Sequence, residues 1–163
     1  MLVIRAGSSV DLPFIMDSWQ KGYRYGSSFG RSGMMNSVFY IGHRRVIESL
    51  LPESLILVAA LEEDPSIIVG YAVIGAHDAS PILHWCHVKE PFRRRGIASL
   101  LFGAANFPPK LKGVVLSHAS DDWYKFLRSK FPDAVYDPYR QFWPAESSRA
   151  PSPGAGTLPL VAG

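Results

Sequence analysis

Apolar and polar residues follow one another along this chain in blocks that predict an ordered series of strands and helices. Leu2 to Arg5 predicts a short strand, and Ser8 to Asp11 carries the start signals of a helix whose apolar positions continue to about Trp19. Residues 22–35 are rich in Gly, Ser and aromatic side chains, which predicts an irregular loop. A second apolar stripe at helical spacing predicts a helix over 36–51.

The apolar pattern then changes to that of strands. Residues 55–61 and 67–74 are continuous apolar runs on either side of a polar turn, which predicts an antiparallel hairpin. A third strand is predicted over 82–88. After it the pattern predicts in turn a helix, a buried strand, a short helix and a last strand, over residues 96–107, 114–117, 121–130 and from Val135 onward.

This order predicts an α/β fold with a mixed, mostly antiparallel sheet flanked by helices. The helix over 96–107 connects two strands and therefore predicts one parallel pair, between strands 82–88 and 114–117. We expect one folded domain over residues 1–143. From Pro144 the composition changes to Ala, Ser, Pro and Gly, which predicts a flexible tail over residues 144–163.

Composition narrows the classes of function. The 163 residues carry a formal net charge of +3 and one cysteine, Cys86, so no intramolecular disulfide can form. No run approaches the roughly 20 apolar residues of a membrane span, so we expect a cytoplasmic protein without a membrane partner. Basic residues cluster at Arg44-Arg45 and at Arg93 to Arg95. Because no base-reading motif accompanies them, nucleic-acid binding is not predicted. No metal site is predicted either.

The second basic cluster lies where a strand gives way to a helix. The first amides of a helix have no partner within the helix, and the helix dipole is positive there. Gly96 lets the backbone approach a phosphate closely, and Ala98 keeps the next position small. The three arginines add attraction for a polyanion. This arrangement predicts a pyrophosphate site.

The run from Val88 to Ala98 resembles the pyrophosphate signature of the GNAT superfamily of N-acetyltransferases. That signature is Arg or Gln, any two residues, Gly, any residue, then Gly or Ala, and here Arg93, Gly96 and Ala98 occupy its fixed positions. The resemblance covers roughly residues 2–136, and it implies a GNAT-like sheet with a central, splayed parallel strand pair. It also implies acetyl-CoA as acyl donor and direct transfer to an amine in a ternary complex.

The resemblance implies a role for each residue of the signature. The amides of five residues would hold the cofactor pyrophosphate: Arg94, Arg95, Gly96, Ile97 and Ala98. The backbone near Val88 would pair with the pantetheine arm, and backbone donors there would polarise the thioester carbonyl. Ser120 is a further cofactor-contact candidate, and a helix cap is its alternative role. Because the amine attacks directly, Cys86 is expected to be a core residue.

A general base is needed because an amine acceptor is protonated at neutral pH. His84 stands four residues before Val88, the offset of a histidine in arylalkylamine N-acetyltransferases, which share the Val-any-any-any-Phe-Arg-any-any-Gly run. We therefore predict His84 as the base, with a core histidine as the alternative. Strict alternation would place two sets on opposite faces of the strand, His84 with Cys86 and Val88, and Leu83 with Trp85 and His87.

The general acid is less well matched. The family's usual tyrosine lies five residues before an aromatic, and counting back from Phe131 gives Phe126, which has no hydroxyl. Tyr124 is the nearest substitute and is our candidate.

The C-terminus is also short, so the acceptor site is expected to be shallow or completed by another subunit of a homodimer. The acceptor is an amine of a small molecule or a protein. The alternative function is a GNAT-fold protein that binds CoA or a macromolecular partner without efficient catalysis.

Overall fold

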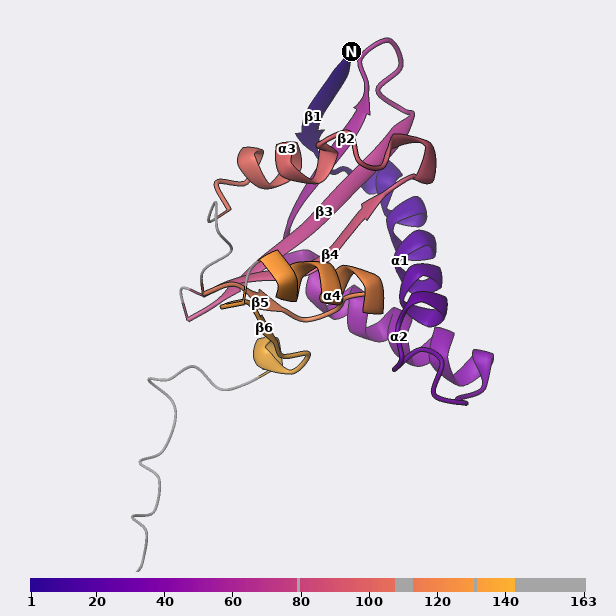
Figure 1. Cartoon of the computed structure of the whole chain (residues 1–163). Coiled ribbons are helices and arrows are strands. Elements are labelled where there is room, and N and C mark those ends of the chain that lie inside the picture. The colour runs from indigo at the N-terminus through magenta and orange to yellow at the C-terminus, as the bar shows by residue number, and fades with distance from the viewer. Residues whose placement is uncertain (79, 108–112, 131, 143–163) are drawn as a thin grey trace, which may run out of the picture.

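One six-stranded sheet runs through the molecule in the order β1-β2-β3-β4-β5-β6 (Figure 1). The computed structural model describes residues 1–78, 80–107, 113–130 and 132–142. The first four strands pair antiparallel, whereas β5 is parallel to both β4 and β6. The strands are β1 (Leu2–Ala6), β2 (Leu55–Leu61), β3 (Ile68–His77), β4 (Ser80–Val88), β5 (Val115–Leu116) and β6 (Val135–Tyr136).

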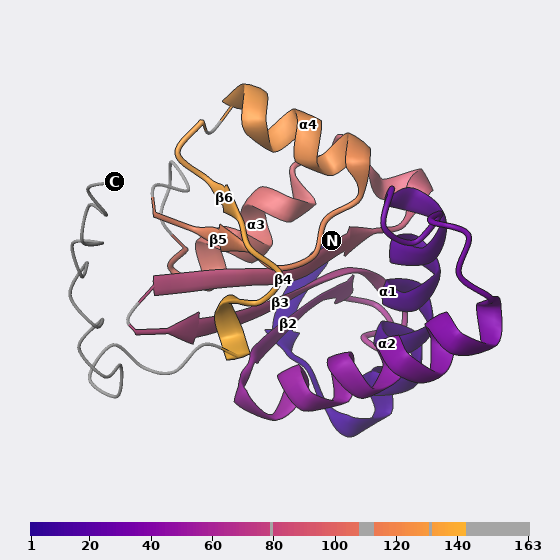
Figure 2. The same cartoon turned by 90° about the horizontal axis from the view of Figure 1, so that it is seen from below.

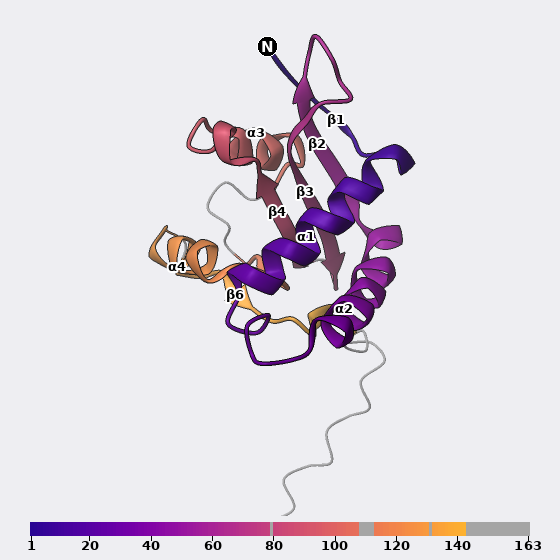
Figure 3. The same cartoon turned by 90° about the vertical axis from the view of Figure 1, so that its right-hand side faces the viewer.

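Helices cover both faces of the sheet. Helices α1 (Leu12–Gly26) and α2 (Asn36–Leu50) lie on one face, and α3 (Ile97–Ala104) and α4 (Asp121–Lys130) lie on the other (Figure 2). Figure 3 shows α1 crossing the strands of its face. Short 3-10 turns precede or follow these elements, at Ser9–Asp11, Leu51–Glu53, Glu90–Phe92 and Arg140–Phe142. Among the described residues, no helix is both long and apolar enough to cross a membrane.

The core has two layers, one on each side of the sheet. On the α1/α2 side, Trp19, Phe39 and Ile47 are almost completely buried against β2, β3 and β4. On the α3/α4 side, Ile97 and Leu101 bury the inner face of α3. Full burial of one such side chain stabilises the fold by roughly 1.5–3 kcal/mol, so the sheet is fixed between its helices mainly by these contacts.

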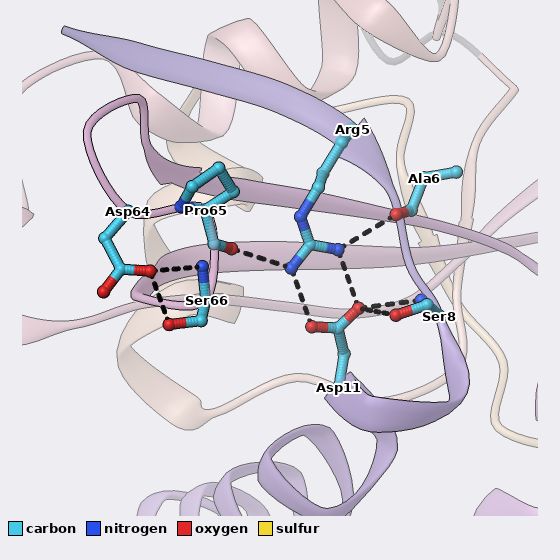
Figure 4. A network of polar contacts seen from close by, with 7 residues as sticks. All are labelled: Arg5, Ala6, Ser8, Asp11, Asp64, Pro65 and Ser66. Carbon is cyan, nitrogen blue, oxygen red and sulfur yellow. Dashed lines mark hydrogen bonds and ion pairs between the residues drawn. The ribbon is translucent and has the colours of Figure 1, made fainter.

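An ion-pair network fastens the N-terminal corner (Figure 4). The guanidinium of Arg5 donates to both carboxylate oxygens of Asp11 at 2.7 and 2.8 Å and to the carbonyl of Pro65 at 3.0 Å. Asp11 also accepts the amide and hydroxyl of Ser8. Chiefly because of the Arg5 hydrogen bonds, the pKa of Asp11 is held well below its usual value. The network joins β1, the start of α1 and the β2–β3 turn.

The predicted order of elements is confirmed, but several bounds differ: β3 continues to His77 and β4 begins at Ser80. Helix α1 continues to Gly26 through residues predicted as loop, and its buried stripe continues with it from Trp19 to Tyr23. Gly22 lies against Trp85, where a Cβ would be 2.8 Å from the ring. Helix α3 ends at Ala104 rather than Phe107. The second parallel pair, β5 with β6, was not predicted. The predicted tail from Pro144 lies outside the described residues.

Candidate functional site

Strand β4 contains a bulge at His84. Val73 of β3 is opposite Trp85, but the next residue, Ile74, is opposite Leu83, so His84 is the extra residue of β4. As a result Leu83 packs in the same core layer as Cys86 and Val88, on the α3 side, whereas Trp85 and His87 lie on the α1 side as expected. The strict alternation predicted for this strand, with Leu83 and Cys86 on opposite faces, is therefore wrong.

The bulge lies where β4 and β5 separate. The two strands pair only at Ile82–Val115 and Leu83–Leu116, and the last bond runs from the Ser117 amide to the Leu83 carbonyl at 3.1 Å. Farther along β4, the Lys89 amide donates to Val69 of β3. Since successive amides of a strand point to opposite edges, those of Cys86 and Val88 point away from β3. No described strand covers that edge, which is the expected splay near Val88.

The loop after β4 contains two residues in the left-handed backbone region. Arg94 has φ 61° and Gly96, the N-cap of α3, has φ 77°. The first bond of α3 runs from the Leu100 amide to the Gly96 carbonyl. Throughout the described chain, no protein acceptor is found for the amides from Arg94 to Ala98. A Cβ at Gly96 would meet no atom within 4 Å, so open space lies next to these amides.

The three arginines of the loop differ in their contacts. Arg93 donates from Nε to the Val88 carbonyl at 2.9 Å and so ties the loop to the end of β4. Arg95 lies over the Phe92 ring, 5.8 Å from its centroid. All three arginine side chains are exposed, whereas Ile97 is buried and anchors α3 in the core. The loop therefore presents free amides and exposed positive charge at a fixed place beside the splay.

His84 belongs to a buried polar cluster. Its Nδ1 lies 2.7 Å from the hydroxyl of Ser117, and the same hydroxyl lies 2.8 Å from Nδ1 of His118. The His84 side chain is only 1% exposed. Burial lowers the pKa of His84 to about 4, and burial, with a smaller effect from His43 and His84, lowers the pKa of His118 well below its usual value. Both imidazoles are therefore neutral at pH 7.

A third histidine completes this cluster from α2. The His43 ring stacks on Tyr23 with centroids 4.8 Å apart and meets the His118 ring edge-on at 5.0 Å. Its Nε2 is buried and has no hydrogen-bond partner among the described residues, and burial lowers its pKa to about 4. His43 was not predicted as a site residue from the sequence. The signal was there, since Phe39, His43 and Ile47 form the buried stripe of α2.

Among the described residues, no hydrogen bond or ring contact joins Tyr124 to His84. Tyr124 packs with the α3/α4 layer and meets Tyr136 edge-on at 5.6 Å, while Ser117 and His118 link His84 to the α1/α2 side. Phe126 is 47% exposed and stacks on Trp123, so it faces away from the core.

Two further candidates have ordinary structural contacts. Ser120 accepts the Trp123 amide at 3.3 Å, as a helix cap does. Cys86 is half-buried against the α3 layer, and burial raises the pKa of its thiol to about 12. The thiol is therefore protonated at neutral pH and is a poor nucleophile.

The loop between α1 and α2 is fastened to α4 by the carboxylate of Asp121. Asp121, in the first turn of α4, accepts the amide and hydroxyl of Ser28 at 2.9 and 2.7 Å and an Arg31 nitrogen at 2.6 Å. These bonds, those of Ser28 first, lower the pKa of Asp121 to about 2. These hydrogen bonds hold the loop between α1 and α2 next to the end of β5.

Comparison with solved structures places this architecture in a known class. YycN of Bacillus subtilis, a proposed acetyltransferase, is 16% identical with a TM-score of 0.59, over 80% of this chain and 90% of that one. A proposed acetyltransferase from Pyrococcus furiosus is 22% identical with a TM-score of 0.50, over 77% and 91% of the two chains. Neither family models nor curated protein sequences gave a match.

These likenesses show the fold. The chain has the GNAT acetyltransferase fold, and the predicted mixed sheet with its parallel, splayed pair is confirmed.

Proposed function

We propose that this protein is an acetyl-CoA-dependent N-acetyltransferase that transfers the acyl group directly to an amine in a ternary complex. The observation that carries the proposal is the row of unpartnered amides from Arg94 to Ala98, which lies just beyond the uncovered edge of β4. Such a surface would bind a ligand that has a pyrophosphate next to a chain of amide groups, and acetyl-CoA contains both.

The residues present fit this donor. The left-handed Gly96 leaves open space in front of the α3 amides, where a phosphate would be held by N–H groups and the positive end of the helix dipole. The exposed side chains of Arg94 and Arg95 add positive charge. The Cys86 and Val88 amides would pair with the pantetheine arm and orient it. When bound, acetyl-CoA supplies an activated acyl thioester.

Proton transfer is assigned to His84 and Tyr124. His84 is neutral at pH 7 and can accept a proton at Nε2 as the N–H bond of an ammonium breaks, since Nδ1 is engaged with Ser117. Because only 1% of the side chain is exposed, the proton passes through a water. The Tyr124 phenol would donate a proton to the leaving thiolate. The acceptor is an amine of a small molecule or a protein; the homodimer and the cytoplasmic location stay predictions.

A second candidate function rests on a specific observation. His84 is deeply buried and Phe126, at the family's usual tyrosine position, faces away from the core, which favours a GNAT-fold protein that binds CoA or a macromolecular partner without efficient catalysis.

Thiol release separates the two functions. Purified protein with acetyl-CoA is assayed for free CoA against a panel of aliphatic amines, arylalkylamines and peptides with free N-termini or lysines, after acetyl-CoA binding has been established by thermal shift. Amine-dependent release supports the transferase. Saturable binding without release from any amine supports the second function, and absence of acetyl-CoA binding overturns the transferase and the CoA-binding form of the second function.

A further inference from the structure

We propose that Ser117 is a positioning residue that holds His84 in the tautomer with its proton on Nδ1, so that Nε2 carries the free lone pair. The inference rests on the proposed function, in which His84 accepts a proton. It starts from one hydroxyl placed between two imidazoles, 2.7 Å from Nδ1 of His84 and 2.8 Å from Nδ1 of His118.

The count of protons restricts the hydrogen bonding at this hydroxyl. A serine has one O–H proton, so it can donate to one Nδ1 only. The other Nδ1 must then carry its own proton and donate it to Oγ, because two bare nitrogens facing one oxygen would leave a buried lone pair unpaired. At least one of the two neutral histidines, His84 or His118, therefore has its proton on Nδ1 and a bare Nε2.

Only one of the two arrangements makes His84 a usable base. Since its Nδ1 is occupied by Ser117, proton transfer must use Nε2, which lies over the bare backbone of Gly75. This requires that Nδ1–H of His84 donate a hydrogen bond to Oγ of Ser117, and that the Ser117 hydroxyl donate a hydrogen bond to Nδ1 of His118. When His84 takes a proton at Nε2, its Nδ1–H bond to Ser117 is unchanged, and the new charge resides on the imidazolium.

The groups that face His84 do not compete for this proton. The titratable side chain joined to His84 through Ser117 is that of His118 after β5, whose ring in turn contacts His43 of α2 and Tyr23 of α1. Burial lowers the pKa of His43 and raises that of Tyr23, so both stay neutral at pH 7. Gln141 approaches Gly75 beside the ring and is uncharged. Among the described residues, Ser117 is thus the group in hydrogen-bond contact with Nδ1 of His84.

The tautomer can be measured directly, without substrate. Long-range ¹⁵N–¹H spectra of the imidazoles are recorded on the full chain at pH 7, assigned with His84→Gln and His118→Gln. We expect a protonated Nδ1 and bare Nε2 for His84, and the reverse for His118. In Ser117→Ala, His84 should become a mixture of tautomers. A wild-type His84 protonated on Nε2, or a tautomer unchanged in Ser117→Ala, would overturn the proposal.

Kinetics with the amine that gives most thiol release provide the second readout. Ser117→Ala should lower kcat by about 10- to 100-fold with the KM for acetyl-CoA within about twofold, because a misplaced tautomer affects proton transfer rather than cofactor binding. Ser117→Thr keeps the hydroxyl and should restore most of kcat.

Ser27→Ala is the matched control, since Ser27 is buried and its hydroxyl donates to a backbone carbonyl of α1. It should keep kcat and the His84 tautomer. Equal losses of kcat in Ser27→Ala and Ser117→Ala would contradict the positioning role. A wild type that has the expected tautomer but acetylates no amine refutes the proposed function and leaves the tautomer assignment standing.

Discussion

The imidazole of His84 lies directly against Gly75. A Cβ atom at Gly75 would be 2.5 Å from Nε2 and 3.2 Å from Cδ2 of His84, closer than real Cβ atoms come to a neighbouring nitrogen. Because Ser117 holds the other side of the ring through Nδ1, the ring cannot retreat without losing that bond. The bare backbone at Gly75 therefore makes room for the histidine that the proposed mechanism requires.

Substituting Gly75 should displace His84. In Gly75→Ala we expect the free energy of unfolding to fall by about 1–3 kcal/mol, because the added methyl overpacks a filled site. Urea denaturation measures this. Gly42→Ala is the control, because a Cβ there meets nothing within 4 Å in α2, and it should stabilise by roughly 0.5–1 kcal/mol. A Gly75→Ala protein as stable as wild type would show that the ring is not confined.

The Arg5–Asp11 pair should contribute to stability at neutral pH. Asp11 is 3% exposed, so Asp11→Asn removes a charge that is paired and desolvated, and should cost about 2 kcal/mol. Asp17→Asn breaks an exposed pair with Lys21 and should cost less than about 0.5 kcal/mol. Since the folded pKa of Asp11 is depressed, its contribution is present above the unfolded value of 3.8 and is lost as the pH falls below it. Equal stabilities of the two variants would contradict the network's role.

The buried histidines should make the fold sensitive to mild acid. His43 has a folded pKa of about 4 against an unfolded value of 6.5, so the unfolded chain binds more protons between these values and stability falls with pH in that window. From pH 7.5 to pH 5 this amounts to about 2 kcal/mol for one histidine. His43→Phe keeps the stacking and should reduce the acid-induced loss by that amount in urea titrations at both pH values. An unchanged loss would mean that His43 is not buried in the neutral form.

The order of strands and helices could be predicted from the sequence because the spacing of apolar residues within each segment distinguishes a helix from a strand. Val88, Gly96 and Ala98 also specify a strand-to-helix turn that needs no tertiary information. The loop that joins β4 to α3 is therefore where the sequence predicts it, and its binding of acetyl-CoA is a proposal.

The bulge of β4 could not be predicted in this way. It arises from the pairing of β3 with β4 around Val73 and Ile74, which is a tertiary property, and it changes the face of Leu83 without changing any residue type. For the same reason, the contacts of Ser117 with His84 and His118 could not be predicted from the sequence. Two of these residues are 33 positions apart, and only the parallel pairing of β4 with β5 brings them into contact. The parallel pairing of β6 with β5 likewise depends on how α4 packs.

The central claim is that acetyl-CoA binds at the loop around Gly96, and isothermal titration calorimetry with acetyl-CoA tests it most directly. Gly96→Val should weaken binding about 100-fold or more, because the side chain fills the space in front of the helix amides. Gly33→Val is the matched control, because Gly33 also has a left-handed backbone, with φ 83°, and open space around it. The substitution therefore imposes a similar backbone strain but leaves the loop around Gly96 unchanged. Wild-type affinity in Gly33→Val with loss in Gly96→Val is the predicted result. A folded Gly96→Val protein that binds acetyl-CoA as tightly as wild type would contradict the claim.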